Sequence, residues 1–352
     1  MAGSGTAHLR PADGALLHAE HIVVEFPVGR SGLKVHAVSD VSLDILEGET
    51  LGLVGESGCG KSTTARAMIQ LPRPTSGTVL FEGQELTKLK GEALRQVRPR
   101  MQMIFQDPIS SLNPRRKIGD LVAEGLEIWS IGDKSSRQKR ADDVLDAVGL
   151  DPEQARGRRP HEFSGGQCQR ISIARAVITE PKLILCDEPV SSLDVSVQAQ
   201  ILNLLQDMKA RFGLTLVFIA HDLAVVKNVS DRVAVMYLGK LCEITQPDEL
   251  YEHPVHPYTA ALLAAIPEPD PAVRPSERDA LSGEIPSPVS PPSGCRFRTR
   301  CPKAQQKCAE EEPVIEEVRP GHFAACHFPL AEGEQLDFTA HPSEGATAPA
   351  AS

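Results

Sequence analysis

The sequence predicts an α/β fold built on a parallel sheet, and three observations lead to that prediction. Short apolar runs of strand length alternate with longer stretches whose apolar residues have helical spacing. The central runs end in glycine-rich or acidic residues, as strands do where a parallel sheet presents its carboxyl ends to a ligand. Apolar residues make up 41% and charged residues 24% of the 352 residues, which is the balance of a folded chain.

The elements follow in chain order. β-Branched runs at 22–24 and 35–45 predict the first strands. Continuous apolar runs, typical of strands buried on both faces, follow at 51–54, 183–186, 214–220 and 233–237. Helical spacing is clearest at 197–211. Residues 107–180 carry charge-dense helical stretches without a convincing strand, which predicts an inserted helical subdomain.

Composition divides the rest of the chain. Residues 1–16 are rich in Gly, Ala and Ser and are expected to be disordered, and 17–265 form the main domain. Eight prolines between Pro267 and Pro292 predict a linker over 266–293. A Cys-rich module follows at 294–329, and an acidic tail at 330–352 is expected to be disordered.

Charge and hydropathy exclude several classes of protein. A net charge of −10 argues against a nucleic-acid partner. No apolar run approaches the length of a membrane span, and the N-terminus lacks the apolar region of a secretory signal. The eight cysteines are too sparse for a disulfide scaffold. We therefore expect a cytosolic chain that reaches a membrane only through partners.

A phosphate-binding motif follows the first continuous apolar run. GESGCGKS at 55–62 matches G-x-x-x-x-G-K-[ST] without a mismatch. Its glycines let N–H groups turn toward phosphate oxygens, Lys61 would reach the β- and γ-phosphates, and the Ser62 hydroxyl would ligate Mg²⁺. The motif predicts a P-loop NTPase (RecA-like) core. The predicted nucleotide-binding residues here are Gly55, Glu56, Ser57, Gly58, Cys59, Gly60, Lys61, Ser62 and Thr63.

The second continuous run ends in two carboxylates, Asp187 and Glu188. At this end of the sheet Asp187 would hold Mg²⁺ through water, and Glu188 would polarise a water in line with the γ-phosphate. A strand ending in Asp-Glu is common by itself. Together with the phosphate loop it predicts a hydrolytic site.

A second anion-receiving arrangement precedes the helical stretch at 168–178. In FSGGQ at 163–167 a serine hydroxyl and two glycines stand at a helix start. One nucleotide seldom needs two phosphate-binding segments from the same chain. The segment at 163–167 is therefore expected to face a nucleotide held by another subunit. Its predicted contact residues are Ser164, Gly165, Gly166 and Gln167.

These ordered motifs resemble the ATP-binding subunits of ABC transporters, whose signature is Leu-Ser-Gly-Gly-Gln; Phe163 stands here in place of the Leu. The resemblance implies an antiparallel β subdomain beside the P-loop core, with ATP and Mg²⁺ as ligands. It implies that Gln106 senses Mg²⁺, the attacking water and the membrane subunit, and that His221 contacts the γ-phosphate. It places Phe26 near the adenine, although a strand-core role for Phe26 is an equal alternative.

Later motifs resemble importers of oligopeptides and dipeptides. They are CQR at 168–170, HPVHPYT at 253–259, GEIPSP at 283–288 and PPSGC at 291–295. GQCQR at 166–170 is similar to the OppF/DppF type. The resemblance implies ATP hydrolysis at the cytoplasmic face of the membrane, with a homologous D-type ATPase, two permease subunits and, indirectly, an extracytoplasmic substrate-binding protein. A homodimer and a nickel-chelate substrate stay open, as do a soluble ABC ATPase acting on ribosomes or DNA and a redox-regulatory protein.

Four cysteines gather late in the chain: Cys295, Cys301, Cys308 and Cys326. In a reducing compartment such a group suggests a metal or iron–sulfur site before it suggests disulfides. The absence of a C-x-x-C pair disfavours zinc, and the family resemblance implies a [4Fe–4S] cluster; zinc and metal-free thiols remain alternatives. Cys59, inside the phosphate loop, is a candidate for modification when no nucleotide is bound.

Overall fold

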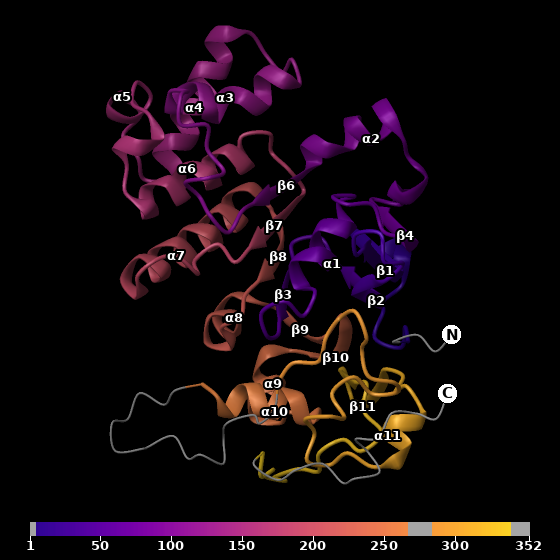
Figure 1. Cartoon of the computed structure of the whole chain (residues 1–352). Coiled ribbons are helices and arrows are strands. Elements are labelled where there is room, and N and C mark those ends of the chain that lie inside the picture. The colour runs from indigo at the N-terminus through magenta and orange to yellow at the C-terminus, as the bar shows by residue number, and fades with distance from the viewer. Residues whose placement is uncertain (1–4, 267–283, 339–352) are drawn as a thin grey trace. The chain divides into compact units, whose positions relative to one another are not determined.

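The computed structural model describes residues 5–266 and 284–338 (Figure 1). The chain divides into two compact units. Unit 1 comprises Met1–Leu46, Leu51–Lys88 and His221–Ser352, and unit 2 comprises Glu47–Thr50 and Leu89–Ala220. Because each unit is drawn from separate stretches of sequence, long-range contacts hold each of them together.

Unit 1 contains a four-stranded antiparallel sheet in the order β2-β1-β4-β5. Its strands are β1 (Leu17–Pro27), β2 (Lys34–Ile45), β4 (Ser76–Phe81) and β5 (Gln84–Glu85). The inward side chains of β1, among them Leu17, Ile22 and Val24, are buried, and helix α1 (Lys61–Met68) packs against β1 and β2. This sheet is the antiparallel β subdomain expected beside the P-loop.

The remaining strands of unit 1 run in the order β11-β12-β10-β9-β3. They are β3 (Thr50–Val54), β9 (Arg232–Tyr237), β10 (Lys240–Thr245), β11 (Glu316–Arg319) and β12 (His322–Ala324). β3 and β9 are parallel, and the pairs from β9 outward are antiparallel. The helices of unit 1 besides α1 are α8 (Leu223–Val229), α9 (Pro247–Glu252), α10 (Pro257–Ala264) and α11 (Gln306–Glu310). The C-terminal segment thus adds β12 to β10 and β11 to β12.

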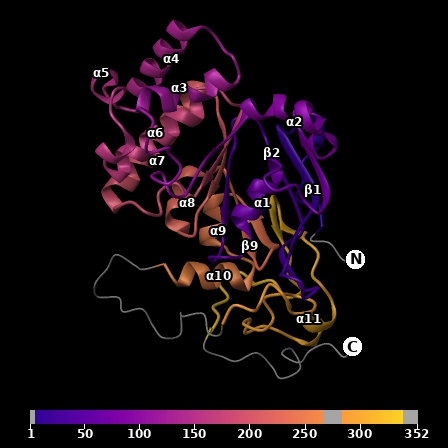
Figure 2. The same cartoon turned by 45° about the horizontal axis from the view of Figure 1, so that its top comes forward.

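Unit 2 contains three parallel strands in the order β8-β7-β6. They are β6 (Met101–Ile104), β7 (Leu183–Asp187) and β8 (Thr215–Ile219), and β7 and β8 are buried throughout. The helices of this unit are α2 (Gly91–Val97), α3 (Ile118–Ile128), α4 (Lys134–Ala147), α5 (Pro152–Ala155), α6 (Gly165–Val177) and α7 (Val195–Phe212). Helices α3 to α6 form one group in both views (Figures 1 and 2), and α3 contacts α4, α5 and α6. This group is the helical part expected within 107–180.

The N-terminal residues correct one prediction. Residues 5–16 were expected to be disordered on composition, but His8 is buried and its Nε2 lies 2.8 Å from the Ser42 carbonyl oxygen. The Arg10 guanidinium pairs with the buried Asp44 carboxylate at 2.5 Å. These polar contacts attach to β2 a segment whose composition alone does not favour ordered structure.

The C-terminal tail differs from its prediction in the same way. Leu330 and Phe338 are buried, and Glu334 pairs with Lys303. Residues 330–338 are therefore anchored at Leu330 and Phe338, with most side chains between them exposed, whereas 339–352 lie outside the described residues. Of the predicted linker, 267–283 also lies outside them, and the carbonyl of Pro288 accepts a 2.9 Å hydrogen bond from the backbone N–H of His36. The structure thus anchors the end of this stretch on β2.

Candidate active site

The phosphate loop connects β3 to α1 within unit 1. All side chains of β3 are buried, and α1 begins at Lys61 after Gly60, whose φ of 106° is left-handed. A Cβ on Gly60 would lie 2.3 Å from the Ala37 carbonyl oxygen, and one on Gly55 would lie 2.1 Å from the Met236 carbonyl oxygen. Only glycine fits at these two positions. The loop therefore has the backbone conformation and helix start that an anion cradle requires.

The Lys61 side chain lies across this loop. Lys61 is buried, and its ammonium group donates to the carbonyl oxygens of Gly55 and Glu56 at 2.7 and 2.9 Å. Ser62 and Thr63, in the first turn of α1, are half-buried. Backbone oxygens of the loop thus hold the cation that is expected to meet the phosphate charge.

Cys59 is less accessible than the sequence suggested. Its side chain is 3% exposed, and burial raises the pKa of the thiol, although nearby Lys61 acts in the opposite direction. Because the thiolate is the reactive species, a buried protonated thiol reacts slowly. The expectation of a reactive Cys59 is therefore not supported.

In unit 2 the acidic pair stands at the end of β7. Asp187 is 2% exposed, while Glu188 is half-buried and has a φ of 47°, an unusual conformation for a residue other than glycine. The Gln106 side-chain amide donates to the Glu188 carboxylate at 3.0 Å. The structure thus brings together Gln106 and Glu188, two predicted catalytic residues 82 positions apart.

The signature segment begins helix α6 of unit 2. The Ser164 hydroxyl accepts from the Gln167 N–H at 3.3 Å, and the Gln167 side-chain oxygen accepts from the Ser164 N–H at 3.0 Å. This reciprocal capping box fixes the start of the helix. A Cβ on Gly166 would lie 2.6 Å from a methyl carbon of Val197 on α7, so the glycine allows close packing of the two helices. Ser164 and Gln167 are exposed.

Two further predicted residues lie in unit 1. His221 is exposed and precedes Asp222, which caps α8 by accepting from the Ala224 N–H at 2.8 Å. Phe26 pairs with Val35 between β1 and β2 and is 40% exposed. That exposure argues against the alternative that Phe26 is a core residue and leaves its ring accessible to a ligand.

The four late cysteines meet in unit 1. Cys295, Cys301, Cys308 and Cys326 all line one small pocket, and every cysteine of the chain is a free thiol. Burial raises the pKa of Cys301 to about 12 and that of Cys326 to about 11, and the neighbouring cysteine sulfurs add to both. Cys301 and Cys326 are therefore expected to be protonated unless a cation binds them.

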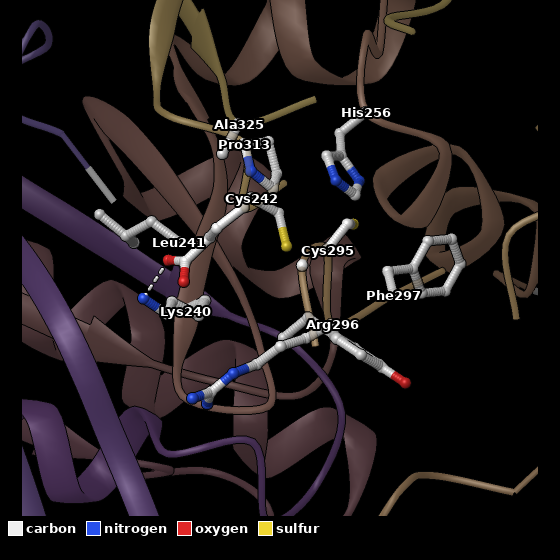
Figure 3. Close-up of a pocket in the computed structure, with 12 residues that line it drawn as sticks. Lys240, Leu241, Cys242, His256, Cys295, Arg296, Phe297, Pro313 and Ala325 are labelled. Atoms are coloured by element: carbon white, nitrogen blue, oxygen red, sulfur yellow. Dashed lines mark hydrogen bonds and ion pairs between the residues drawn. The ribbon is translucent and has the colours of Figure 1, made fainter. Parts of the chain in front are cut away.

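A second cavity lies beside them (Figure 3). Cys242 and Cys295 contribute to its lining, and Lys240 forms an ion pair with Glu312 at its edge. Burial also raises the pKa of Cys242 well above its usual value. Among residues 5–266 and 284–338, no group of three or more His, Cys, Asp or Glu side chains is arranged around a single point as one metal ion would require.

Sequence reasoning missed two residues that contact the phosphate loop. The Tyr258 hydroxyl accepts from the Glu56 N–H at 2.8 Å, and the Arg300 guanidinium pairs with the Glu56 carboxylate. Tyr258 belongs to the HPVHPYT segment that carried the resemblance to peptide importers. No sequence motif identified Arg300, because a single sequence does not reveal a contact between residues 244 positions apart.

Comparison with known proteins assigns the family. A model described as "ABC transporter" matches residues 38–191, and one described as "Oligopeptide/dipeptide transporter, C-terminal region" matches residues 242–308. The oligopeptide transport ATP-binding protein OppF of Salmonella typhimurium is 57% identical over 284 residues, covering 80% of this chain and 84% of that protein. The oligopeptide transport ATP-binding protein AppF of Bacillus subtilis is 50% identical over 321 residues, covering 89% and 97%.

A solved structure agrees with this assignment. The ATP-binding cassette MJ0796, in its dimeric post-hydrolysis state with ADP and Pi, matches with a TM-score of 0.60 and 28% identity over 66% of this chain and 98% of that one. The fold and the motifs define an ATPase of the ATP-binding cassette class, which confirms the predicted fold class. The chain belongs to the ABC transporter family, among the members that carry the oligopeptide/dipeptide transporter C-terminal region.

Within the described part of the chain, no helix has the length and apolarity needed to cross a membrane.

Proposed function

We propose that this chain binds and hydrolyses ATP to energise peptide import through separate permease subunits. The observation that carries the proposal is the combination, in one chain, of a complete phosphate loop, an acidic strand end, a signature helix and the peptide-transporter C-terminal region. The relatives OppF and AppF are named as oligopeptide transport ATP-binding proteins. We propose the cytoplasmic face of the membrane as its location.

The proposed chemistry assigns a role to each group. The loop N–H groups and Lys61 would bind the β- and γ-phosphates of ATP, and Phe26 would contact the adenine. Glu188, oriented by Gln106, would accept a proton from the attacking water as its oxygen approaches the γ-phosphorus. His221 would contact the γ-phosphate from the segment that precedes α8.

The predicted Mg²⁺ fits the donor set. Ser62 offers a hydroxyl, Gln106 an amide oxygen and Asp187 a carboxylate, and these oxygen donors are the ligands that Mg²⁺ prefers. The ion would neutralise charge on the phosphates. These three residues would hold it directly or through water.

The functional assembly is proposed to contain two ATPase subunits. Ser164, Gly165, Gly166 and Gln167 would contact the nucleotide bound by the partner, which we take to be a D-type homologue. A dimer of the cassette MJ0796 is a precedent for such pairing. Two permeases would dock both ATPases, and an extracytoplasmic protein would deliver the substrate.

We propose the domain division predicted from the sequence: an ATPase domain at 17–265 and a Cys-rich module at 294–329, joined by 266–293. The module would hold a [4Fe–4S] cluster through Cys295, Cys301, Cys308 and Cys326. Four free thiols that line one pocket supply the donor set that such a cluster takes.

The proposed cluster has a direct test. Anaerobically purified full-length protein should contain iron and acid-labile sulfide and should absorb visible light, and Cys301→Ser should remove these signals. Colourless protein with one bound zinc, or metal-free folded protein, would each disprove the cluster. Its role would be structural, because it would tie together the loops that carry the four cysteines.

Transport itself is tested by complementation. A strain lacking this chain should lose uptake of labelled oligopeptides, and the wild-type gene but not a Lys61→Ala variant should restore it. The exposed Lys88→Ala is the matched control. Normal peptide uptake in the deletion strain, with loss of nickel-chelate uptake instead, would overturn the peptide assignment while leaving the ATPase assignment in place.

A further inference from the structure

A side chain of the C-terminal region contacts the phosphate loop through a two-point ion pair. The Arg300 guanidinium donates to both Glu56 carboxylate oxygens, at 2.8 Å through Nη1 and 3.0 Å through Nη2. The Arg300 side chain is 5% exposed and that of Glu56 is 22% exposed. A bidentate geometry with a buried guanidinium is the strong form of this interaction.

Arg300 is itself held in place from several sides. Its backbone N–H donates to the Phe297 carbonyl at 2.9 Å, and its Nη1 lies 3.5 Å from the Tyr237 hydroxyl. The rings of Tyr237, Tyr258 and Phe297 pack together, with centroids 4.7 to 5.3 Å apart. The guanidinium therefore has little freedom and can fix the position of its partner.

The backbone of Glu56 is fixed by the same cluster. Its N–H donates to the Tyr258 hydroxyl at 2.8 Å, and its carbonyl accepts from Lys61 at 2.9 Å. Glu56 is thus held at its N–H, its carbonyl and its carboxylate, and Lys61 is bound to the same residue. A shift of the Glu56 backbone would consequently displace the lysine that meets the phosphates.

The ion pair compensates a negative charge in the phosphate loop. Glu56 places a negative charge inside a loop that must receive a triphosphate, and an unpaired carboxylate there would repel the ligand. Arg300 compensates that charge and engages both carboxylate oxygens. The pKa of Arg300 is lowered by burial but raised more by its hydrogen bonds to Glu56 and Tyr237, so the cation persists.

From these contacts we infer that Arg300 is a positioning residue of the nucleotide site, which holds the phosphate loop and neutralises Glu56 from the C-terminal region. The inference rests on the proposed binding of ATP at this loop. It makes the C-terminal region part of the machinery for nucleotide binding.

The test uses full-length protein with Mg²⁺ and ATP, measuring the Kd for ATP and the KM and kcat of hydrolysis. Arg300→Met should raise Kd and KM by about tenfold, because one partner of a largely buried ion pair is lost. The kcat should change little, since Arg300 touches no reacting atom. Arg300→Lys, which keeps the charge but not the bidentate geometry, should recover part of the affinity.

The double variant separates charge compensation from simple loss of structure. Glu56→Gln removes the carboxylate charge, so Arg300→Met should have much less effect in that background than in the wild type. The matched control is Arg298→Met, which removes an equally buried arginine whose guanidinium donates to the Ser293 carbonyl. It should lower thermal stability but leave the Kd for ATP unchanged.

Each result decides the inference. A wild-type Kd in Arg300→Met, the same loss in the Glu56→Gln background, or an equal loss of affinity in Arg298→Met would overturn it. Failure of the proposed function is distinguishable, because then wild-type protein would not bind ATP or Lys61→Ala would bind it as well as wild type. If Arg300→Met does not fold, the comparison of Arg300→Lys with and without Glu56→Gln gives the same decision.

Discussion

The Gln106 amide donates a 3.0 Å hydrogen bond to the Glu188 carboxylate, although the two residues come from opposite ends of the helical insertion. Gln106 follows β6 and Glu188 follows β7, and these neighbouring strands are parallel. Their carboxyl ends therefore meet at one edge of the sheet. The bond orients the carboxylate that is proposed to act on the attacking water.

Glu188→Gln tests that role. The amide keeps the shape of the side chain but cannot accept the proton, so hydrolysis should fall by about a hundredfold or more while ATP binding is retained. Steady-state turnover and ATP binding are measured on the same preparation. The exposed Glu153→Gln should behave as wild type, and wild-type turnover in Glu188→Gln would refute the assignment.

Lys61→Ala should act on binding instead of chemistry. Its ammonium group lies across the loop on the Gly55 and Glu56 carbonyls, where it would compensate phosphate charge. We expect ATP affinity to drop by on the order of tenfold to a hundredfold, the cost of a lost charge-assisted interaction. Titration of ATP against the variant measures this directly. Unchanged affinity would show that the phosphates bind elsewhere.

The strands that the sequence predicted and those it missed differ in a physical way. The runs at 51–54 and 183–186 are buried on both faces, so their apolar pattern was continuous and easy to interpret. β10 contains Lys240 and Glu243, and β6 contains Gln102, which interrupts the pattern. Glu243 is fully buried because His322 and backbone N–H groups bind its carboxylate. No local pattern predicts such tertiary compensation.

In the candidate site too, the sequence predicted the local motifs but not the long-range contacts. Motif spacing located the phosphate loop, the acidic pair and the signature, since local backbone geometry dictates those residue types. The contact of Arg300 with Glu56 and the packing of His8 on β2 are long-range and involve single side chains. Composition instead suggested that the N-terminal residues were disordered. Only the folded arrangement reveals these contacts.

His8 predicts a pH dependence of stability. Burial lowers the pKa of its imidazole below the ordinary 6.5; nearby Arg232 lowers it further, while the Ser42 carbonyl and Asp44 act in the opposite direction. The folded state therefore favours the neutral ring, and the unfolded state binds more protons below pH 6.5. This contribution to stability is present above pH 6.5 and is lost as the pH falls below it.

A substitution isolates this contribution of His8. His8→Gln can still donate to the Ser42 carbonyl but does not titrate, so the decline in stability below pH 6.5 should become shallower. Urea unfolding at several pH values measures it. The exposed His161→Gln is the control and should keep the wild-type slope. An identical slope in His8→Gln would show that His8 does not stay neutral in the folded protein.

Ser164 tests how the two ATPase subunits share their nucleotides. Ser164 and Gln167 are exposed, and the capping box between them fixes the geometry at the start of α6. If this segment faces the partner's ATP, Ser164→Arg should impair turnover at the site whose lysine belongs to the partner, because the bulky side chain blocks the helix start. The nucleotide bound at Lys61 of the same chain should be unaffected.

Mixing singly substituted subunits and measuring nucleotide occupancy and turnover at each site distinguishes the two effects. The exposed Ser135→Arg on α4 is the control. Loss of ATP binding at Lys61 in a folded, isolated Ser164→Arg monomer would rule out a shared site, because a monomer has no partner nucleotide for the segment to contact.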